Sequence, residues 1–407
     1  MRKSHLFPIF LVYFLDNISF AVVFPLFSTL ILTAQFNIVP FSEDLSIRTA
    51  MLGALNASFP LALLIGAPIM GDLSDHFGRK KTFLITVAAT TLGNLVTGIA
   101  IYSQNYLLLI GSRLFCGFFS GNLTLCFAAI SDLSPNAKIR AKNFGNLTAV
   151  GGVGWITAIG GLSWILAMIG GGNLSLRSPS LPFWIVSAIG LFNLIILYIL
   201  FPETHPVRQR LNFRLSPIFN QIIDAFRTHH LRPLFLVQFF FIFGWLFIFQ
   251  WFAGYSTAHY GQPRNVTSIS LTLIGLCWIF GAAVLNRYLV RYIPLKKIPL
   301  YGLILLTLLL LATSYFPRYS ILIALDCLTA LIVSFTSANL FNLISLTARE
   351  SIQGKVMGLG QSVITAAQFA APLVGSFTPI QNIPLLYRIA ALSTMLAFVL
   401  YRSTHTR

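Results

Sequence analysis

Long apolar runs separated by short polar gaps dominate the chain. Most of the runs reach about 20 residues, the length that an α-helix needs to cross the hydrocarbon core of a bilayer. They are continuous, whereas the strands of a membrane β-barrel would alternate apolar and polar residues. The pattern therefore predicts an all-α integral membrane protein with twelve transmembrane helices, at 6–33, 48–72, 82–102, 105–131, 143–169, 181–201, 232–255, 267–290, 298–316, 319–345, 355–378 and 384–402.

The longest polar stretch, 203–231, lies between the sixth and seventh runs and leaves six runs on each side. Equal halves around a hydrophilic linker are typical of two parallel repeats related by an axis along the membrane normal. We therefore expect two pseudo-symmetric six-helix bundles, an N-terminal one at 1–202 and a C-terminal one at 232–407. The stretch between them is expected to be a cytoplasmic linker.

The linker carries a helix-start signal. Ser216 and Pro217 resemble an N-cap followed by a first-turn proline. The apolar residues that follow fall on one helical face, which predicts an amphipathic helix at 217–228 on the inner membrane surface. Such a helix serves either as a packing tether between the halves or as a regulatory or partner-binding element.

The composition strengthens the membrane prediction. Of the 407 residues, 56% are hydrophobic and 9% are charged, and the mean hydropathy is +0.81. Soluble domains carry roughly 25% charged residues, so a soluble surface built from this chain would lack the charge that keeps it dispersed. Lipid is the natural solvent of such a chain, and in lipid only helices and closed barrels satisfy every backbone polar group.

The formal net charge of +17 would suit nucleic-acid binding, but the basic residues are not gathered in one patch. They occupy the short gaps between apolar runs, as the positive-inside rule describes. With a cytoplasmic N-terminus, 21 of the 27 Lys and Arg residues fall on the inner side, five on the outer side and Arg113 within a span. We expect a monomeric multi-pass protein of the bacterial inner (plasma) membrane, with both termini cytoplasmic and no nucleic-acid partner.

Residues that would support an enzyme or a metal site are sparse. The four cysteines, Cys116, Cys126, Cys277 and Cys327, lie in apolar runs without CxxC spacing, which indicates small buried side chains. The seven histidines lie in loops, tails or span ends without HExxH spacing, and no GxxxxGK[ST] motif occurs. We expect no enzyme activity, no cofactor and no metal; a polytopic enzyme, a channel and a non-transporting receptor are the alternatives to a transporter.

One loop carries a specific motif, Gly71-Asp72-Leu73-Ser74-Asp75-His76-Phe77-Gly78-Arg79-Lys80-Lys81. It resembles the signature loop of the major facilitator superfamily, G-x-L-[SA]-D-[RK]-x-G-R-[RK]-[RK], with His76 the one specified position that departs. The two glycines would allow a close helix approach and a tight turn. The resemblance implies a major facilitator fold in which Gly71, Asp75, Gly78 and Arg79 latch the two halves in the outward-facing state. Asp132 is either a further partner of Arg79 or a simple helix-end cap.

Further resemblances lie in the N-terminal half. Leu15-Asp16-Asn17 with Phe24-Pro25-Leu26 resembles the first-span motif of tetracycline-type drug:proton antiporters. The segment around Arg113 resembles the family's fourth-span arginine motif, and Phe201-Pro202-Glu203-Thr204 resembles the usual end of span six. The fifth span is rich in glycine but lacks the antiporters' Gly-Pro pair. The resemblance implies a secondary transporter of a small organic molecule that works by alternating access and proton-coupled efflux; proton-linked uptake of a nutrient, metabolite or siderophore is the alternative.

Three ionisable residues lie deep in predicted spans. Asp16, Arg113 and Asp326 are roughly 15, 12 and 10 Å from the span ends at 1.5 Å per residue. Each needs a partner, a wet cavity or a function. We expect them to face one central cavity, where Asp16 or Asp326 binds a proton in alternation with substrate and Arg113 tunes a carboxylate or binds an anionic group. The alternative is a static ion pair.

Candidate substrate contacts are weaker. Gln238, Phe241 and Trp245 lie in the seventh span, and Asn339 and Gln361 lie in the tenth and eleventh. Aromatic rings with a few amides suit an amphipathic organic substrate. The alternative is that these side chains face lipid or fill the core.

Overall fold

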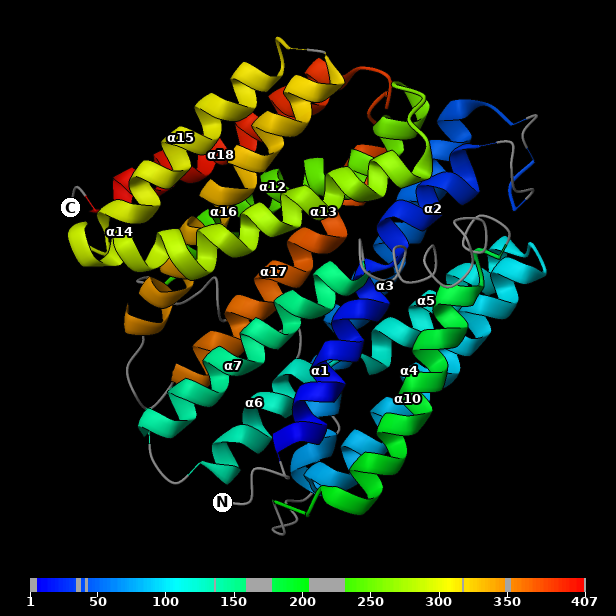
Figure 1. Cartoon of the computed structure of the whole chain (residues 1–407). Coiled ribbons are helices and arrows are strands. Elements are labelled where there is room, and N and C mark those ends of the chain that lie inside the picture. Colours follow the sequence, from blue (N-terminus) through cyan, green and yellow to red (C-terminus); the bar gives the residue numbers. More distant parts are fainter. Residues whose placement is uncertain are drawn as a thin grey trace. The chain divides into compact units, whose positions relative to one another are not determined.

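The described part of the chain is helical throughout. The computed structural model describes residues 6–33, 38–40, 43–134, 137–158, 178–204, 231–316, 318–347 and 353–405, and no strand occurs among them. The helices, labelled in Figure 1, are α1 Leu6–Ala21, α2 Val23–Leu32, α3 Leu45–Phe77, α4 Arg79–Tyr102, α5 Tyr106–Phe119, α6 Asn122–Leu133, α7 Ala137–Ile156, α10 Leu181–Leu200, α12 Arg232–Ala258, α13 Arg264–Phe280, the π-helix η3 Gly281–Leu285, α14 Asn286–Tyr292, α15 Lys297–Thr313, α16 Tyr319–Thr347, α17 Gln353–Ser376 and α18 Ile383–His405.

Each of the twelve predicted apolar runs overlaps one helix or up to three consecutive helical elements. Within the described ranges, nine helical segments are long and apolar enough to cross a membrane. Helix α15 is also apolar but, with 17 residues, is shorter than these nine segments and is not counted among them. The predicted amphipathic helix at 217–228 lies outside the described residues, as does the second part of the fifth run.

The described residues divide into two compact units. The first contains those within 6–30, 38–40 and 58–204, and the second those within 31–33, 43–57 and 231–405. Helix α3 therefore begins in the second unit and ends in the first. The predicted bundle boundaries at 202 and 232 stay a prediction.

In the first unit, α4 packs against α5 and α10, and α1 packs against α6, α7 and α10 (Figure 1). The core around Ile9, Phe83 and Leu125 is apolar and buried. Glycines let the helices approach: a Cβ at Gly151 would meet the Tyr13 ring, and one at Gly154 would lie 2.8 Å from the Phe14 carbonyl oxygen. Small residues at contacts are the usual device of membrane helix packing.

In the second unit, α12 is the central helix and packs against α13, α16, α17 and α18. Most of its length is buried, including Phe241, Phe247 and Trp251. Close contacts again use glycine, because a Cβ at Gly244 would lie 2.9 Å from the carbonyl oxygen of Ala390 on α18. In this unit the neighbouring helices therefore surround the apolar helix α12. The few polar groups buried among them are candidates for a functional role.

Candidate functional site

The turn between α3 and α4 is built on Gly78. Its φ is +91°, a conformation that side chains with a Cβ rarely adopt. A Cβ there would also meet the carboxylate of Glu203. No close approach is found at Gly71: apart from its chain neighbours and the adjacent backbone of its own helix, no described atom lies within 4 Å of the position that its Cβ would take. The structural need for glycine in this loop therefore lies at position 78.

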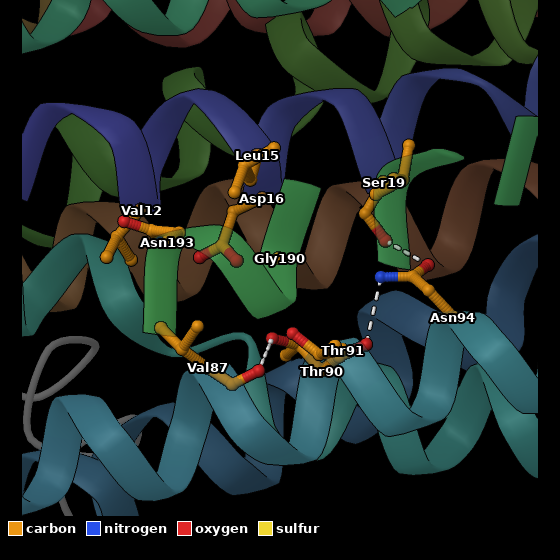
Figure 2. A pocket seen from close by; sticks show the side chains of 11 residues that line it. Val12, Leu15, Asp16, Ser19, Val87, Thr90, Thr91, Asn94, Gly190 and Asn193 are labelled. Atoms are coloured by element: carbon orange, nitrogen blue, oxygen red, sulfur yellow. Dashed lines mark hydrogen bonds between the residues drawn. The ribbon is translucent and has the colours of Figure 1, made fainter. Parts of the chain in front are cut away.

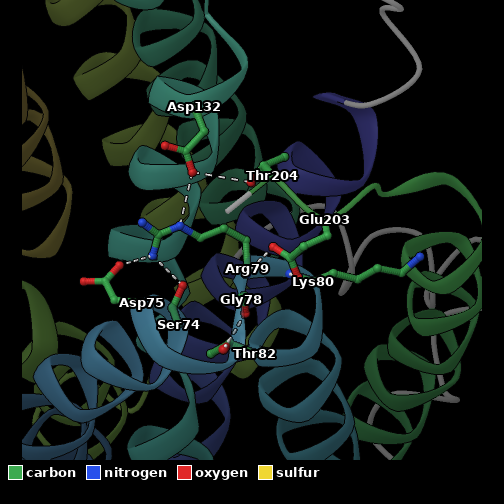
Figure 3. Close-up of polar contacts among 9 residues, drawn as sticks. All are labelled: Ser74, Asp75, Gly78, Arg79, Lys80, Thr82, Asp132, Glu203 and Thr204. Carbon is green, nitrogen blue, oxygen red and sulfur yellow. Dashed lines mark hydrogen bonds and ion pairs between the residues drawn. The ribbon is translucent and has the colours of Figure 1, made fainter. Parts of the chain in front are cut away.

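Arg79, directly after this turn, joins three elements through its guanidinium group (Figure 3). Nη1 donates to Ser74 Oγ and to Asp75 Oδ1, both at 2.6 Å, and Nε donates to Asp132 Oδ2 at 3.3 Å. The Arg79 side chain is 9% exposed, against 50% for Asp75 and 25% for Asp132. Asp132 is thus a partner of Arg79 from the end of α6, and the cation is held between two carboxylates.

Glu203 completes this group of residues from the segment after α10. Its two carboxylate oxygens accept the backbone N–H groups of Arg79 at 2.8 Å and Lys80 at 3.2 Å. These are the first N–H groups of α4, where a negative charge complements the unpaired donors and the helix dipole. Thr204 Oγ1 donates to Asp132 Oδ2 at 3.4 Å. Sequence reasoning identified Glu203 only as part of a span end, although an acidic residue beside a basic helix start was a usable signal.

Asp16 lies on α1 and borders a small cavity inside the first unit (Figure 2). Its Oδ2 accepts a hydrogen bond from Asn122 Nδ2 on α6 at 2.9 Å, and no ion pair to Asp16 occurs among the described residues. The cavity lies between α1, α4 and α10 and is lined by Val12, Leu15, Asp16, Ser19, Val87, Thr90, Thr91, Asn94, Val186, Gly190 and Asn193.

Carboxamides and hydroxyls surround this cavity. Ser19 Oγ donates to Asn94 Oδ1 at 2.8 Å, and Asn94 Nδ2 donates to the carbonyl oxygen of Thr90 at 2.9 Å. Asn193 is 0% exposed, and neither its amide nitrogen nor its oxygen has a hydrogen-bond partner in the described part of the chain. Sequence reasoning missed both asparagines; a lone carboxamide in an apolar span is the signal that would have found them.

Arg113, on α5, is 1% exposed and lies among aromatic rings. Its guanidinium carbon is 4.6 Å from the centroid of the Phe59 ring and 5.9 Å from that of Phe27. Nη2 donates to the carbonyl oxygen of Ser19 at 3.2 Å, and Nη1 has no partner among the described groups. Among the described residues no carboxylate forms an ion pair with Arg113, and its role toward a carboxylate or an anionic group stays a prediction. Ring faces and a backbone carbonyl compensate the cation, and that carbonyl belongs to Ser19, which also lines the Asp16 cavity.

Asp326, on α16, is 2% exposed and is held by tyrosines of the second unit. The Tyr387 hydroxyl on α18 lies 2.9 Å from Oδ1 and 2.8 Å from Oδ2. The Tyr255 hydroxyl on α12 lies 2.8 Å from that of Tyr387 and 3.5 Å from Oδ2. Both tyrosines are fully buried. All partners of this carboxyl group in the described chain are neutral.

The residues expected to contact substrate are distributed through the second unit. Gln238 and Phe241 are buried on α12, and Gln238 Oε1 has no partner among the described residues. Trp245 is half-buried and stacks on Phe249. Asn339 Nδ2 donates to Asn286 Oδ1 at 2.6 Å, and Gln361 is half-buried on α17.

Comparisons with known proteins identify the family. The model of the Major Facilitator Superfamily matches residues 9–372. The tetracycline resistance protein of class H from Pasteurella multocida is 28% identical over 391 residues, which cover 93% of this chain and 89% of that protein. The structure of the human organic anion transporter MFSD10 (TETRAN) has a TM-score of 0.74 at 19% identity and covers 98% of this chain and 99% of its own. A D-xylose–proton symporter has a TM-score of 0.75 at 16% identity, with 97% of both chains covered.

Because the family model spans most of the sequence, the chain belongs to the Major Facilitator Superfamily. It has that family's fold of two six-helix bundles, as predicted from the twelve apolar runs. It is a multi-pass integral membrane protein and a transporter of small molecules, and not an enzyme.

Proposed function

We propose that this protein exports a small organic molecule in exchange for protons. The observation that carries the proposal is a pair of membrane-buried carboxyl groups, one in each unit, that have only neutral hydrogen-bond partners among the described residues. A buried carboxyl group without a counter-ion favours the protonated form, whereas access to water favours the charged form. A transporter that alternately opens and closes its units around such groups can therefore take up a proton on one side and release it on the other.

Similarity to a tetracycline resistance protein supports the efflux direction. The tetracycline resistance protein is similar along nearly the whole chain, and the Leu15-Asp16-Asn17 segment of this chain resembles the first-span motif of such antiporters. The fold by itself does not select a direction, since a D-xylose–proton symporter shares it. Proton-linked uptake is the second candidate, and the missing Gly-Pro pair in the fifth predicted span, 143–169, favours it.

Everted membrane vesicles with a dye for the internal pH test both candidates. A substrate is first found by thermal stabilisation of the purified protein, with tetracycline as the first probe. Adding the substrate to acidified vesicles should release protons if the protein is an antiporter. Asp16→Asn and Asp326→Asn should each abolish this release, whereas Glu43→Gln, an exposed carboxylate before α3, should leave it intact. Full proton coupling in both aspartate variants would reject the proposal.

The Arg79 group is proposed as the conformational latch. Gly78 and Glu203 shape the turn, and Asp75 and Asp132 hold the guanidinium group. Lysine lacks the forked geometry that contacts two groups at once. Arg79→Lys should therefore slow transport while substrate still binds with unchanged affinity, and Arg291→Lys, at an exposed site on α14, should change neither. Equal transport rates in the two variants would contradict a latch at Arg79.

The remaining assignments complete the proposal. Gln238, Phe241, Trp245, Asn339 and Gln361 are proposed to contact the substrate; alanine variants of the polar members should weaken substrate-induced thermal stabilisation without loss of folded protein. The protein is proposed to act as a monomer in the bacterial inner membrane with both termini cytoplasmic, and reporter fusions at each terminus would test the orientation.

A further inference from the structure

The cavity beside Asp16 differs from an ordinary packing defect. Its lining combines apolar side chains, among them Val12, Leu15 and Val87, with polar ones, among them Asp16, Asn94 and Asn193 (Figure 2). Its volume for the centre of a water-sized molecule is about 10 Å³, which is room for about one water. Apolar cavities of this size stay dry, whereas a polar one with two or more partners holds a water molecule.

Asn193 supplies the second observation. Its side chain is 0% exposed and lines the cavity from α10, and both amide atoms lack a partner in the described chain. Burying a carboxamide without hydrogen bonds is unfavourable, and natural proteins rarely contain a buried carboxamide that lacks them. A single water molecule that accepts from Asn193 Nδ2 would supply the partner that this nitrogen lacks.

Asp16 provides the other partner. Asn122 donates one hydrogen bond to its Oδ2, and a carboxyl group offers up to about four acceptor positions in total. Asn94 is engaged with Ser19 and Thr90. Asp16, which accepts one hydrogen bond, and Asn193, which makes none among the described residues, therefore offer hydrogen-bonding groups to the cavity from α1 and α10.

We propose that this cavity binds one water molecule, held by Asn193 and hydrogen-bonded to Asp16, through which Asp16 exchanges its proton. When Asp16 releases its proton, the O–H bond of the carboxylic acid breaks, the water oxygen takes the proton, and bulk water accepts it from there. Asn193 is a positioning residue in this step. The inference rests on the proposed proton coupling for its role, whereas the water site itself stands on the cavity and on Asn193.

Hydroxyl-radical footprinting by X-ray radiolysis in ¹⁸O-labelled water tests the site directly on the full-length protein. Val12 and Val237 are almost equally buried, at 1% and 0% exposure, but only Val12 lines the cavity. Val12 should acquire ¹⁸O and Val237 should not. In Asn193→Leu, labelling of Val12 should fall to the level of Val237, and Asn193→Ser, which keeps a hydroxyl group, should retain it. Labelling of Val12 that is absent, or that persists in the leucine variant, would overturn the site.

Transport measurements test the role of Asn193 in proton exchange at Asp16. Asn193→Leu should lose most substrate-driven proton release without a change in substrate affinity and should shift the pH profile of transport. Ser187→Ala is the control: it removes a buried hydroxyl of α10 that bonds to the Thr91 carbonyl oxygen but does not line the cavity. Replacing sodium by choline should have no effect, and a sodium requirement would overturn water as the occupant. If wild-type protein moves no protons but Val12 is labelled, the proposed function fails and the water site stands.

Discussion

The two buried carboxyl groups belong to different units and have different surroundings. Asp16 accepts one hydrogen bond, from an amide, and borders a cavity with an unsatisfied asparagine. Asp326 lies against two buried tyrosine hydroxyls, one of which contacts both of its oxygens. Asp326 also does not line that cavity. The same side chain is therefore held loosely in one unit and tightly in the other.

A carboxyl group inside a membrane protein can therefore be accommodated in two ways. A donor such as the Tyr387 hydroxyl, which itself lies 2.8 Å from that of Tyr255, compensates the carboxyl group with fixed dipoles and keeps it in place. In a polar cavity, a water molecule can instead form the compensating hydrogen bonds, and the carboxyl group can exchange its proton with that water molecule. On this comparison Asp16 is suited to rapid exchange, whereas Asp326 is suited to a switch that operates only when α12, α16 or α18 moves.

Lengthening each aspartate by one methylene group should produce the largest contrast. Asp326→Glu should lower the free energy of unfolding by about 2 kcal/mol, because added groups in a closed core cost roughly 1–3 kcal/mol. Asp16→Glu should cost less than half of that, since it can extend into the cavity. Denaturation by sodium dodecyl sulfate in mixed micelles measures both; equal costs would remove the distinction between the sites.

Removing the main donor to Asp326 should have the next largest effect. Tyr387→Phe should cost up to about 1.7 kcal/mol, the upper end measured for hydrogen bonds between membrane helices, because this hydroxyl contacts both carboxylate oxygens. The same unfolding measurement applies. Tyr401→Phe, which removes the bond to the Lys296 carbonyl oxygen near the end of α18, provides a matched comparison away from the carboxyl group.

The corresponding change at Asp16 should be smaller. Asn122→Leu should cost about 0.6 kcal/mol, the average for such bonds, because the adjacent cavity offers Asp16 another partner. A further reason is that the Asn122 oxygen, which has no partner among the described residues, is removed as well. A loss as large as that of Tyr387→Phe would show that Asp16 depends on Asn122 as strongly as Asp326 depends on its tyrosine.

Tyr255→Phe should have the smallest effect. Its hydroxyl is 3.5 Å from Asp326, beyond a good O–H···O distance, and its close contact is with Tyr387. We expect a cost below about 0.6 kcal/mol in unfolding and unchanged proton coupling. Coupling lost in this variant but kept in Tyr387→Phe would reverse the roles assigned to the two tyrosines.

The sequence was most informative where the signal is local. The turn at Gly78 and the neighbouring basic residues identify the family because their spacing within eleven residues already encodes the motif. The depth of Asp16 and Asp326 in their spans followed from counting along apolar runs. The hydrogen-bond partners of these two carboxyl groups could not be predicted, because the residue pattern within one span does not indicate which tyrosine or asparagine of another helix will contact it.

The surroundings of Arg113 show the same limit. Its charge in an apolar span predicted a carboxylate or an anion nearby, yet the rings of Phe59 and Phe27 and the Ser19 carbonyl oxygen surround it. Phenylalanine is so common in this chain, with 37 copies, that no single one could be selected from the sequence as a cation partner. Asn193 was overlooked for the opposite reason, because one asparagine in a long apolar run looked incidental.

The membrane environment, the all-helical class, the approximate spans and the family could be read from the amino-acid sequence alone. These depend on apolar length, charge distribution and one contiguous motif, all of which are readable residue by residue. Which groups contact one another required the folded structure: Tyr387 lies 61 positions from Asp326, and Asn122 lies 106 positions from Asp16. Helix packing sets those contacts, and it depends on the shapes of many side chains at once, so the difference between the open site at Asp16 and the closed one at Asp326 exists only in the folded units.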